Sequence, residues 1–171
     1  MADSEDKNVL VYLLAGFGLG ALVGAAAGLL FAPKAGSELR GDISGKVKEL
    51  KDRGDVVLLD ARPPPVYEGQ GPWAKPGHIP GSINLPWRSI MEPGNTRKLR
   101  PIEEVRKAFT SVGATPDKLI ICSCGTSREA TCEFIALKWL LDYPSVHIYE
   151  GAYTEWSSYP ENPTVVGKDP Y

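Results

Sequence analysis

The chain of 171 residues contains one run, Val9–Ala32, in which 24 consecutive residues carry no charge. As a helix rising about 1.5 Å per residue, this run would be about 36 Å long, more than the roughly 30 Å hydrocarbon core of a bilayer. We therefore predict a leader over residues 1–8, one transmembrane helix over residues 9–32 and a separate folded domain further along the chain.

Four glycines recur within this run at every fourth position: Gly16, Gly20, Gly24 and Gly28. In a helix they would lie on one face, where a second helix can approach closely within a bilayer. Self-association of the helix and a simple membrane anchor are both open interpretations. A helix outside the bilayer is the third, and glycine disfavours it because glycine is a poor helix former in water.

The charges that flank the run predict its orientation. The leader carries three acidic residues and one lysine, so it lacks the basic region of a cleaved signal peptide. Residues 33–53 form a basic juxtamembrane helix or linker, with these cations: Lys34, Arg40, Lys46, Lys48, Lys51 and Arg53. Because positive residues favour the cytoplasmic side, we expect the C-terminal domain to face the cytoplasm.

The stretch Gly28–Arg40, GLLFAPKAGSELR, together with the glycines before it, resembles the small bacterial YtxH-like membrane proteins. The resemblance covers about residues 9–50 and implies no chemistry. Together with the uncharged run and the charges that flank it, the resemblance predicts a single-pass protein of the bacterial inner membrane whose C-terminal domain lies in the cytoplasm.

The bulk composition excludes several classes of function. The net charge of −2 does not predict a nucleic-acid surface. Three cysteines, of which Cys122 and Cys124 lie one residue apart, do not form the framework of a secreted disulfide-rich domain and fit a reducing compartment better. Their spacing also fits no zinc site, so we expect neither a metal nor a cofactor.

Residues 54–171 alternate predicted strands with predicted helices. The strands are Val56–Asp60, Ile83–Leu85, Leu119–Ser123 and Val146–Tyr149, and the helices are Pro101–Val112 and Arg128–Leu141. Such alternation predicts an α/β fold with a parallel sheet covered by helices on both faces. Pro63–Pro65 is expected to lack regular structure, and Gly69–Pro80 to form a surface loop.

The strand Leu119–Ser123 is followed by four small or polar residues and then by the predicted helix that begins at Arg128. In parallel sheets, active sites lie beyond the carboxyl ends of the strands. The backbone N–H groups of the loop and the helix dipole would stabilise a Cys124 thiolate and lower the pKa of the thiol, and Arg128 would add a positive charge. This arrangement suits a nucleophile that attacks an anionic sulfur donor, forms a persulfide and passes the sulfur on.

Four segments in order resemble the rhodanese family: Val56–Arg62, Gly77–Trp87, Cys124–Ala130 and Leu137–Trp156. The resemblance runs from about residue 55 to residue 165 and implies a sulfurtransferase with Cys124 as its nucleophile. It implies donor and acceptor of sulfur as small-molecule partners. Substrate-binding positions would be Gly125, Thr126, Ser127, Arg128 and Glu129, and supporting positions Asp60, Arg62, His78 and Trp156.

Two cysteines compete for the role of nucleophile. Cys122 and Arg128 are separated by five residues, which fits the Cys-x5-Arg loop of protein phosphatases. Counting from Asp117 along the strand and back from Leu137 both lead to Cys124 in the rhodanese register, which leaves Cys122 inside the strand. A buried packing role is the common fate of a free cysteine.

The active-site loop departs from the family pattern. Many rhodanese loops have glycine and then arginine or threonine where this chain has Ser127 and Glu129, and Gly125 and Thr126 replace basic residues of thiosulfate-preferring members. Fewer cations weaken the case for thiosulfate as donor and leave a persulfide, polysulfide or mercaptopyruvate open. A non-catalytic interaction module at the membrane is the alternative function, which the intact Cys124 and Arg128 disfavour.

Overall fold

The computed structural model describes residues 45–171, so the predicted leader and the predicted membrane helix with its four glycines lie outside the described residues. Within residues 45–171, no helix is long and apolar enough to cross a bilayer. The described part begins with a helical stretch over residues 45–50. Of the predicted linker over residues 33–53, only the part from residue 45 lies within the described residues.

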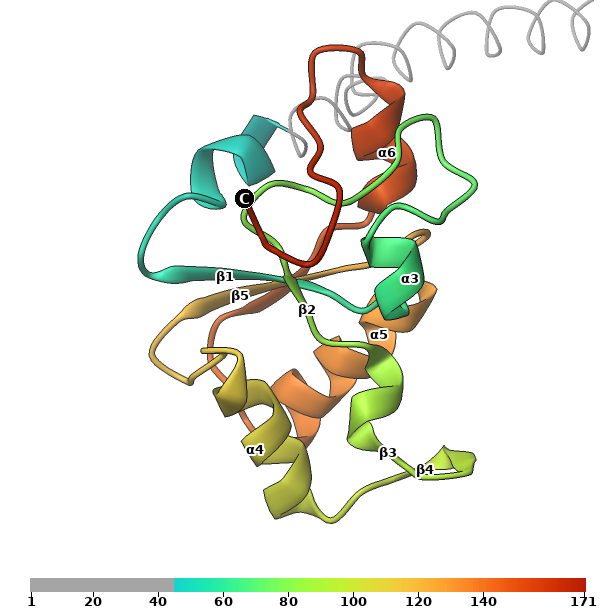
Figure 1. Cartoon of the computed structure of the whole chain (residues 1–171). Helices are drawn as coiled ribbons and strands as arrows, with labels where there is room; N and C mark the ends of the chain where they lie inside the picture. The colour runs from blue at the N-terminus through green and yellow to red at the C-terminus, as the bar shows by residue number, and fades with distance from the viewer. Residues whose placement is uncertain (1–44) are drawn as a thin grey trace, which may run out of the picture. The chain divides into compact units, whose positions relative to one another are not determined.

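A parallel sheet of four strands in the order β2-β1-β5-β6 forms the centre of the domain (Figure 1). Its strands are β1 (Val56–Asp60), β2 (Ile83–Asn84), β5 (Leu119–Ser123) and β6 (Val146–Ile148). All three neighbouring pairs run parallel, which confirms the predicted α/β sheet. The bounds of β1 and β5 are those predicted, whereas β2 and β6 each end one residue earlier.

Side chains that alternate along the strands enter two separate hydrophobic cores. Leu59 and Cys122 face the first core, against which α4 (Ile102–Ser111) and α5 (Arg128–Ile135) pack. Leu58 faces the second core, together with Val47 of the first helix and Trp156 of α6 (Ala152–Ser158). Helices therefore cover both faces of the sheet, as predicted.

Four elements were not predicted from the sequence: α3 (Pro64–Tyr67), the 3₁₀ helix η1 (Trp87–Ile90), the antiparallel hairpin of β3 (Met91–Glu92) and β4 (Asn95–Leu99), and α6 (Ala152–Ser158). The prediction that Pro63–Pro65 lacks regular structure is wrong for its last two residues. Pro64 and Pro65 occupy the first helical positions of α3, where a missing N–H costs no hydrogen bond.

The predicted long helix after the active-site loop also differs in its second half. After Ile135 the chain continues as a π-helical turn, η2 (Ala136–Leu140), rather than as an α-helix to Leu141. The wider turn rotates the following side chains relative to an α-helix. Ile135, Trp139 and Leu140 are exposed there, with Trp139 at 73% of its full accessibility.

The sheet brings two strand ends together. Asp60, the last residue of β1, pairs with Ser123, the last residue of β5. The main-chain N–H of Ala61 also donates to the Ser123 carbonyl at 2.9 Å. The segment after β1 and the loop after β5 therefore start side by side at the carboxyl edge of the sheet, where the sequence predicts the site.

Candidate active site

The loop Cys124–Ser127 is anchored to α6 through its main chain. The Cys124 carbonyl accepts a hydrogen bond from the Tyr153 N–H at 2.9 Å. The Gly125 carbonyl accepts one from the Thr154 N–H at 3.1 Å and one from the Thr154 hydroxyl at 2.6 Å. These bonds fix the loop from the C-terminal side of the chain, through the Thr-Glu-Trp segment that resembles the family.

The Cys124 thiol lies among the backbone N–H groups of the loop, an arrangement we call the backbone cradle. The backbone N–H groups of Thr126 and Ala130 both donate to its sulfur. Cys124 is fully buried, whereas the side chain of Thr126 is exposed. Two converging N–H groups can hold a negative charge on a sulfur atom, as the sequence of this loop predicts.

The predicted lowering of the Cys124 pKa is wrong in direction. Burial of the thiol raises its pKa to about 11. The N–H groups of Ala130 and Thr126 act to lower the pKa, and the Glu129 carboxylate, which faces the thiol, adds to the rise. Removal from water disfavours the thiolate more than the two donors favour it, so the resting thiol holds its proton at neutral pH.

The sequence predicts that Arg128 stabilises the Cys124 thiolate, but the structure places Glu129 beside the thiol instead. Glu129 is the charged side chain that acts on the Cys124 thiol, and the Arg128 side chain is exposed. A helix turns by about 100° per residue, so consecutive side chains point in different directions. The prediction that Arg128 stabilises the Cys124 thiolate therefore finds no support in the structure.

Ser127 holds the loop through an unusual backbone conformation and its hydroxyl. Its φ of 67° lies in the left-handed region, where glycine has the lowest cost. The hydroxyl donates to the carbonyls of Tyr149 and Glu150, at 3.1 and 2.7 Å. Glycine at this family position thus has a conformational reason, and in this chain the serine hydroxyl ties the loop to the segment after β6.

Replacing Glu129 by glutamine should lower the pKa of the Cys124 thiol. A carboxylate within a few ångströms repels the thiolate, since both are negative, and a change of one pKa unit alters the thiolate population about tenfold. We expect iodoacetamide to alkylate Cys124 of Glu129→Gln about three to ten times faster than wild type near about pH 8. The wild-type rate should still be rising at about pH 10 because its pKa lies near 11.

The measurement is the pH dependence of alkylation, followed by mass spectrometry of the Cys124 peptide. Glu103→Gln on α4, which removes an exposed carboxylate elsewhere, is the matched control and should leave the profile unchanged. Coinciding profiles for wild type and Glu129→Gln would show that the Glu129 carboxylate does not act on the thiol.

Trp73 covers the active-site loop, a role that sequence reasoning missed. Its indole N–H donates to the Thr154 hydroxyl at 2.8 Å, and that hydroxyl donates to the Gly125 carbonyl. The ring lies so close to Gly125 that any Cβ there would collide with it. The only signal in the sequence was an aromatic residue in the Gly- and Pro-rich stretch Gly69–Pro80.

Asp60 and Arg62 form a buried ion pair behind the loop. The Arg62 guanidinium donates to both Asp60 carboxylate oxygens, the shortest contact being 2.6 Å, and to the Gly77 carbonyl at 3.0 Å. The same group lies 4.1 Å from the ring centroid of Tyr153 and 4.9 Å from that of Trp73. The pair thus joins the end of β1 to the Gly77 turn, α6 and the loop that carries Trp73.

His78 and Trp156 are also buried supports. The two ring nitrogens of His78 lie 3.1 Å from the carbonyls of Tyr67 and Asp169, and its ring stacks on Tyr67 at 3.7 Å. Burial lowers the His78 pKa, so the imidazole is neutral at physiological pH. The Trp156 indole donates to the Pro163 carbonyl at 2.8 Å within the second core.

Cys122 lies inside β5 and faces the first core, fully buried. Burial, and after it the nearby Glu133, raises the pKa of its thiol well above the ordinary value. This buried position gives no support to the phosphatase interpretation, in which Cys122 would be the nucleophile of a Cys-x5-Arg loop. Cys132 is partly buried on α5, and no three His, Cys, Asp or Glu side chains among residues 45–171 gather closely enough to hold a metal ion.

Glu133 is a buried acid that the sequence did not signal. It lies on α5 with no solvent-accessible surface, and neither carboxyl oxygen has a hydrogen-bond partner among the described residues. Burial, and after it the charge of Asp60, raises its pKa well above the ordinary value of 4.5. Burial without a hydrogen-bond partner therefore favours the protonated form of Glu133 in the folded protein.

Glu133→Gln should make the stability of the domain less dependent on pH. When wild type unfolds above about pH 4.5, Glu133 releases a proton, so each further pH unit lowers the free energy of unfolding by about 1.4 kcal/mol until the folded pKa is reached. The variant should therefore gain on wild type between about pH 5 and about pH 7, by up to about 1.4 kcal/mol per pH unit.

The measurement is urea denaturation of the fragment 40–171, which forms one compact unit and contains both hydrophobic cores. The difference between variant and wild type cancels other titrating groups. An equal difference at the two pH values would mean that the Glu133 carboxyl already ionises in the folded state.

Comparisons with known proteins agree with this geometry. The family described as the rhodanese-like domain matches residues 44–159, and the YtxH-like protein family matches residues 14–65. A "putative thiosulfate sulfurtransferase" of Synechococcus elongatus is 40% identical over 75% of this chain and 42% of its own length. The sulfur carrier protein TtuD of Thermus thermophilus is 32% identical over 76% of this chain and 48% of its own length.

A solved structure extends the likeness to three dimensions. The anaerobic ergothioneine biosynthesis enzyme from Chlorobium limicola, in complex with trimethyl histidine, has a TM-score of 0.65 at 27% identity and covers 72% of this chain and 31% of its own. The chain spans less than half the length of each of these relatives. Because the family match covers more than half of the sequence and includes the strand, loop and helix around Cys124, the chain belongs to the rhodanese-like domain family.

Proposed function

We propose that this protein is a sulfurtransferase that moves a sulfane sulfur from an anionic donor to a thiophilic acceptor through a persulfide on Cys124. The observation that carries the proposal is the pair of backbone N–H groups, from Thr126 and Ala130, that donate to the Cys124 sulfur. Such donors can stabilise the charge of a thiolate and of the persulfide that replaces it. The names of relatives, thiosulfate sulfurtransferase and sulfur carrier protein, support the same chemistry.

The reaction consists of two displacements at sulfur. With thiosulfate as donor, the Cys124 sulfur attacks the outer sulfur, the S–S bond of thiosulfate breaks, and sulfite leaves. The thiol proton passes to solvent, and Cys124 carries the transferred sulfur as a persulfide. An acceptor such as cyanide then takes the outer sulfur, and Cys124 returns to the thiol state.

The charge around the thiol bears on the choice of donor. The Glu129 carboxylate faces Cys124, and the loop lacks the basic residues found in thiosulfate-preferring members. A doubly charged thiosulfate ion is repelled by that carboxylate more than a singly charged persulfide is. We therefore propose that the protein accepts thiosulfate but reacts faster with a persulfide donor.

A steady-state assay separates the candidate functions. The purified protein is given thiosulfate and cyanide, thiocyanate is measured, and hydrolysis of p-nitrophenyl phosphate is measured in parallel. Turnover to thiocyanate without release of phosphate supports the sulfurtransferase. Failure with thiosulfate, polysulfide and mercaptopyruvate alike would favour a non-catalytic interaction module, and release of phosphate a phosphatase that uses Cys122.

We further propose that residues 9–32 anchor the protein in the bacterial inner membrane as a single pass, with the catalytic domain in the cytoplasm. The uncharged run and the YtxH-like match support this proposal, and the face of Gly16, Gly20, Gly24 and Gly28 offers a surface for self-association. The full chain should stay with membranes during carbonate extraction. Its release into the soluble fraction would contradict the anchor.

A further inference from the structure

Cys124, the nucleophile of the proposed reaction, has no accessible surface. A sulfur donor has to touch its sulfur atom for the first displacement, so part of the surrounding structure has to move in every catalytic cycle. Local opening starts where a segment has few bonds to the rest of a domain. The bonds around the active-site loop therefore indicate which segment moves.

Most of the structure around the active-site loop is firmly bonded. The carbonyls of Cys124 and Gly125 accept hydrogen bonds from the main chain of α6 at 2.9 and 3.1 Å, and Ser127 is tied to the segment after β6. The exception is the segment of residues 71–74, in the loop that leads from α3 to β2 beside α6 (Figure 1). In the described part of the chain, its main chain makes no hydrogen bond.

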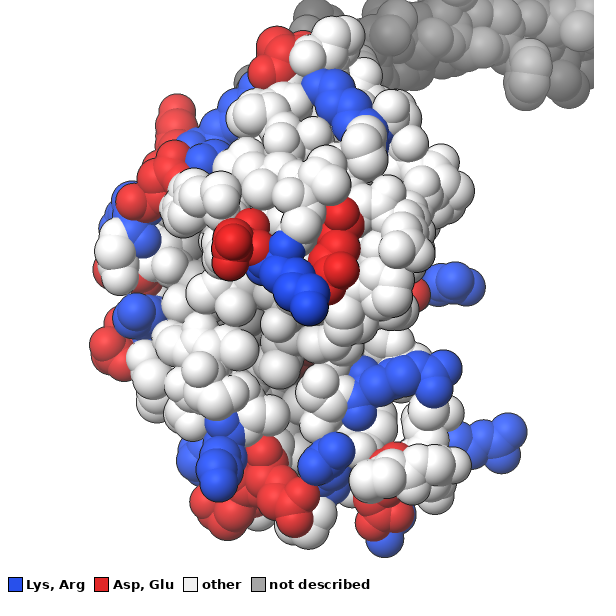
Figure 2. All heavy atoms as spheres, viewed as in Figure 1, with Lys and Arg blue, Asp and Glu red and all other residues white. Residues whose placement is uncertain are grey.

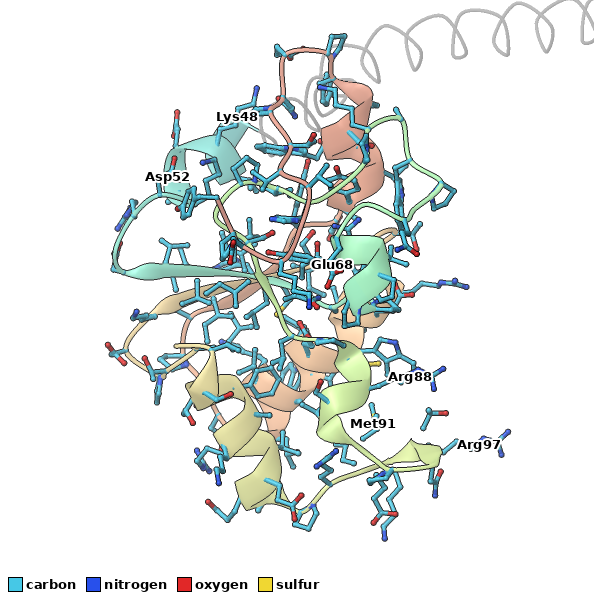
Figure 3. The ribbon with its side chains drawn as sticks, viewed as in Figure 1. Lys48, Asp52, Glu68, Arg88, Met91 and Arg97 are labelled. Carbon is cyan, nitrogen blue, oxygen red and sulfur yellow. The ribbon has the colours of Figure 1, made fainter. Side chains whose placement is uncertain are left out.

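The loop that contains residues 71–74 is held at both ends. It starts after Glu68, labelled in Figure 3, and the Gln70 N–H donates to the Pro65 carbonyl at 2.8 Å. At the other end, the Lys75 ammonium donates to three carbonyls of the segment after α6, at 2.7, 2.8 and 2.6 Å. Between these ends, residues 69–74 carry no charge, and Figure 2 shows the surface there as almost free of charged side chains.

Trp73 joins the middle of this segment to the active-site loop. Its indole N–H donates to the Thr154 hydroxyl at 2.8 Å, and that hydroxyl donates to the Gly125 carbonyl at 2.6 Å. The ring also fills the space between two glycines, since a Cβ on Gly71 or on Gly125 would collide with it. The guanidinium of Arg62 lies 4.9 Å from the ring centroid. A few contacts of one side chain thus hold the segment against the loop.

We propose that Trp73 is a latch that keeps the active-site loop in a closed conformation, in which Cys124 is buried, and that its release admits the sulfur donor. The inference rests on the proposed sulfurtransferase function. Trp73 is a positioning residue, because it acts through Gly125 and Thr154 and does not touch the reacting sulfur. Closure after the first displacement keeps a Cys124 persulfide away from water and from other thiols.

Trp73→Phe keeps an aromatic ring but removes the indole N–H. Loss of one neutral hydrogen bond should raise the population of the open conformation about fivefold. Because apparent affinity scales with the fraction of protein that is competent to bind, kcat/KM for thiosulfate should rise about fivefold through a lower KM. A residue that only supports the active conformation would give the opposite result, a lower kcat/KM.

Hydrogen exchange of the full-length protein, followed by mass spectrometry, measures the opening without any sulfur donor. The peptide that contains the loop Cys124–Ser127 should exchange about five times faster in Trp73→Phe than in wild type. The peptide that contains β1 reports on unfolding of the whole domain and should keep its wild-type rate.

Gly71→Ala tests the latch without changing the indole. The new Cβ would collide with the Trp73 ring, so the ring has to leave its place between the two glycines. We expect faster loop exchange and a higher kcat/KM, as in Trp73→Phe, and no further effect of Gly71→Ala in a Trp73→Ala background. Trp139→Phe, the same change at an exposed tryptophan of η2, is the matched control and should alter neither quantity.

Unchanged loop exchange in both Trp73→Phe and Gly71→Ala would overturn the inference. Faster exchange combined with a lower kcat/KM for thiosulfate would overturn it too, because Trp73 would then support the active conformation. A wild-type protein that forms no persulfide would contradict the proposed function, whereas the exchange experiment would still decide whether Trp73 holds the loop closed.

Discussion

Cys124→Ser is expected to reduce sulfur transfer from thiosulfate to cyanide to the uncatalysed background, a loss of at least about a thousandfold. A serine hydroxyl cannot take up a sulfane sulfur, so no persulfide forms. Cys124 carries the only thiol of the loop Cys124–Ser127, so the N–H groups of Thr126 and Ala130 have no other sulfur atom there to stabilise. The measurement is the initial rate of thiocyanate formation.

Cys122→Ser is the matched control for this loss, since it makes the same chemical change two residues away. Cys122 faces the first core, so its replacement should cost about 1 kcal/mol of stability and retain most of the activity. Both variants need thermal unfolding curves to show that they are folded. Activity that survives Cys124→Ser and is lost with Cys122→Ser would reverse the assignment and favour the phosphatase register.

Arg62→Met should lower the free energy of unfolding by about 3–5 kcal/mol. Arg62 and Asp60 are both almost fully buried, and the guanidinium donates to both carboxylate oxygens. Removing the cation leaves a buried carboxylate without its partner, which costs more than the pair itself contributes. The measurement is urea denaturation of the fragment 40–171, which forms one compact unit.

The double variant Asp60→Asn/Arg62→Met distinguishes charge from packing. It removes both charges, so we expect it to recover part of the stability that the single variant loses. A double variant as unstable as Arg62→Met would show that the loss comes from packing of Arg62 against Trp73 and Tyr153 rather than from an unpaired carboxylate.

Sequence reasoning succeeded for the elements with strong local signals. The continuous apolar runs of β1 and β5 defined both strands to the residue, because strands covered on both faces carry few polar positions. The hairpin strand β4 was missed because four of its five residues are exposed and polar, so no hydrophobic alternation marks it. The π-turn η2 likewise has no signature in the sequence.

The candidate site was likewise predicted correctly only where it depends on local sequence. The order of strand, small loop and helix identified the Cys124 cradle, because backbone geometry follows from local sequence. The direction of the Cys124 pKa did not follow, because it depends on burial and on which way Glu129 turns. Trp73 was missed because its contacts with Gly125 and Thr154 join segments that lie far apart in the chain.

Locating the transferred sulfur tests the central claim most directly. After incubation with the donor, the thiols and persulfides are alkylated and the protein is digested with trypsin. Cleavage after Lys118 and Arg128 gives one peptide that holds both Cys122 and Cys124, and a second that holds Cys132. Fragmentation at Ser123 then separates the first two cysteines.

We predict that the mass of one additional sulfur atom appears on the fragment that contains Cys124 and disappears when cyanide is added. Additional sulfur on Cys122 or Cys132, or a Cys124 that stays unmodified with every donor while the protein is folded, would contradict the account.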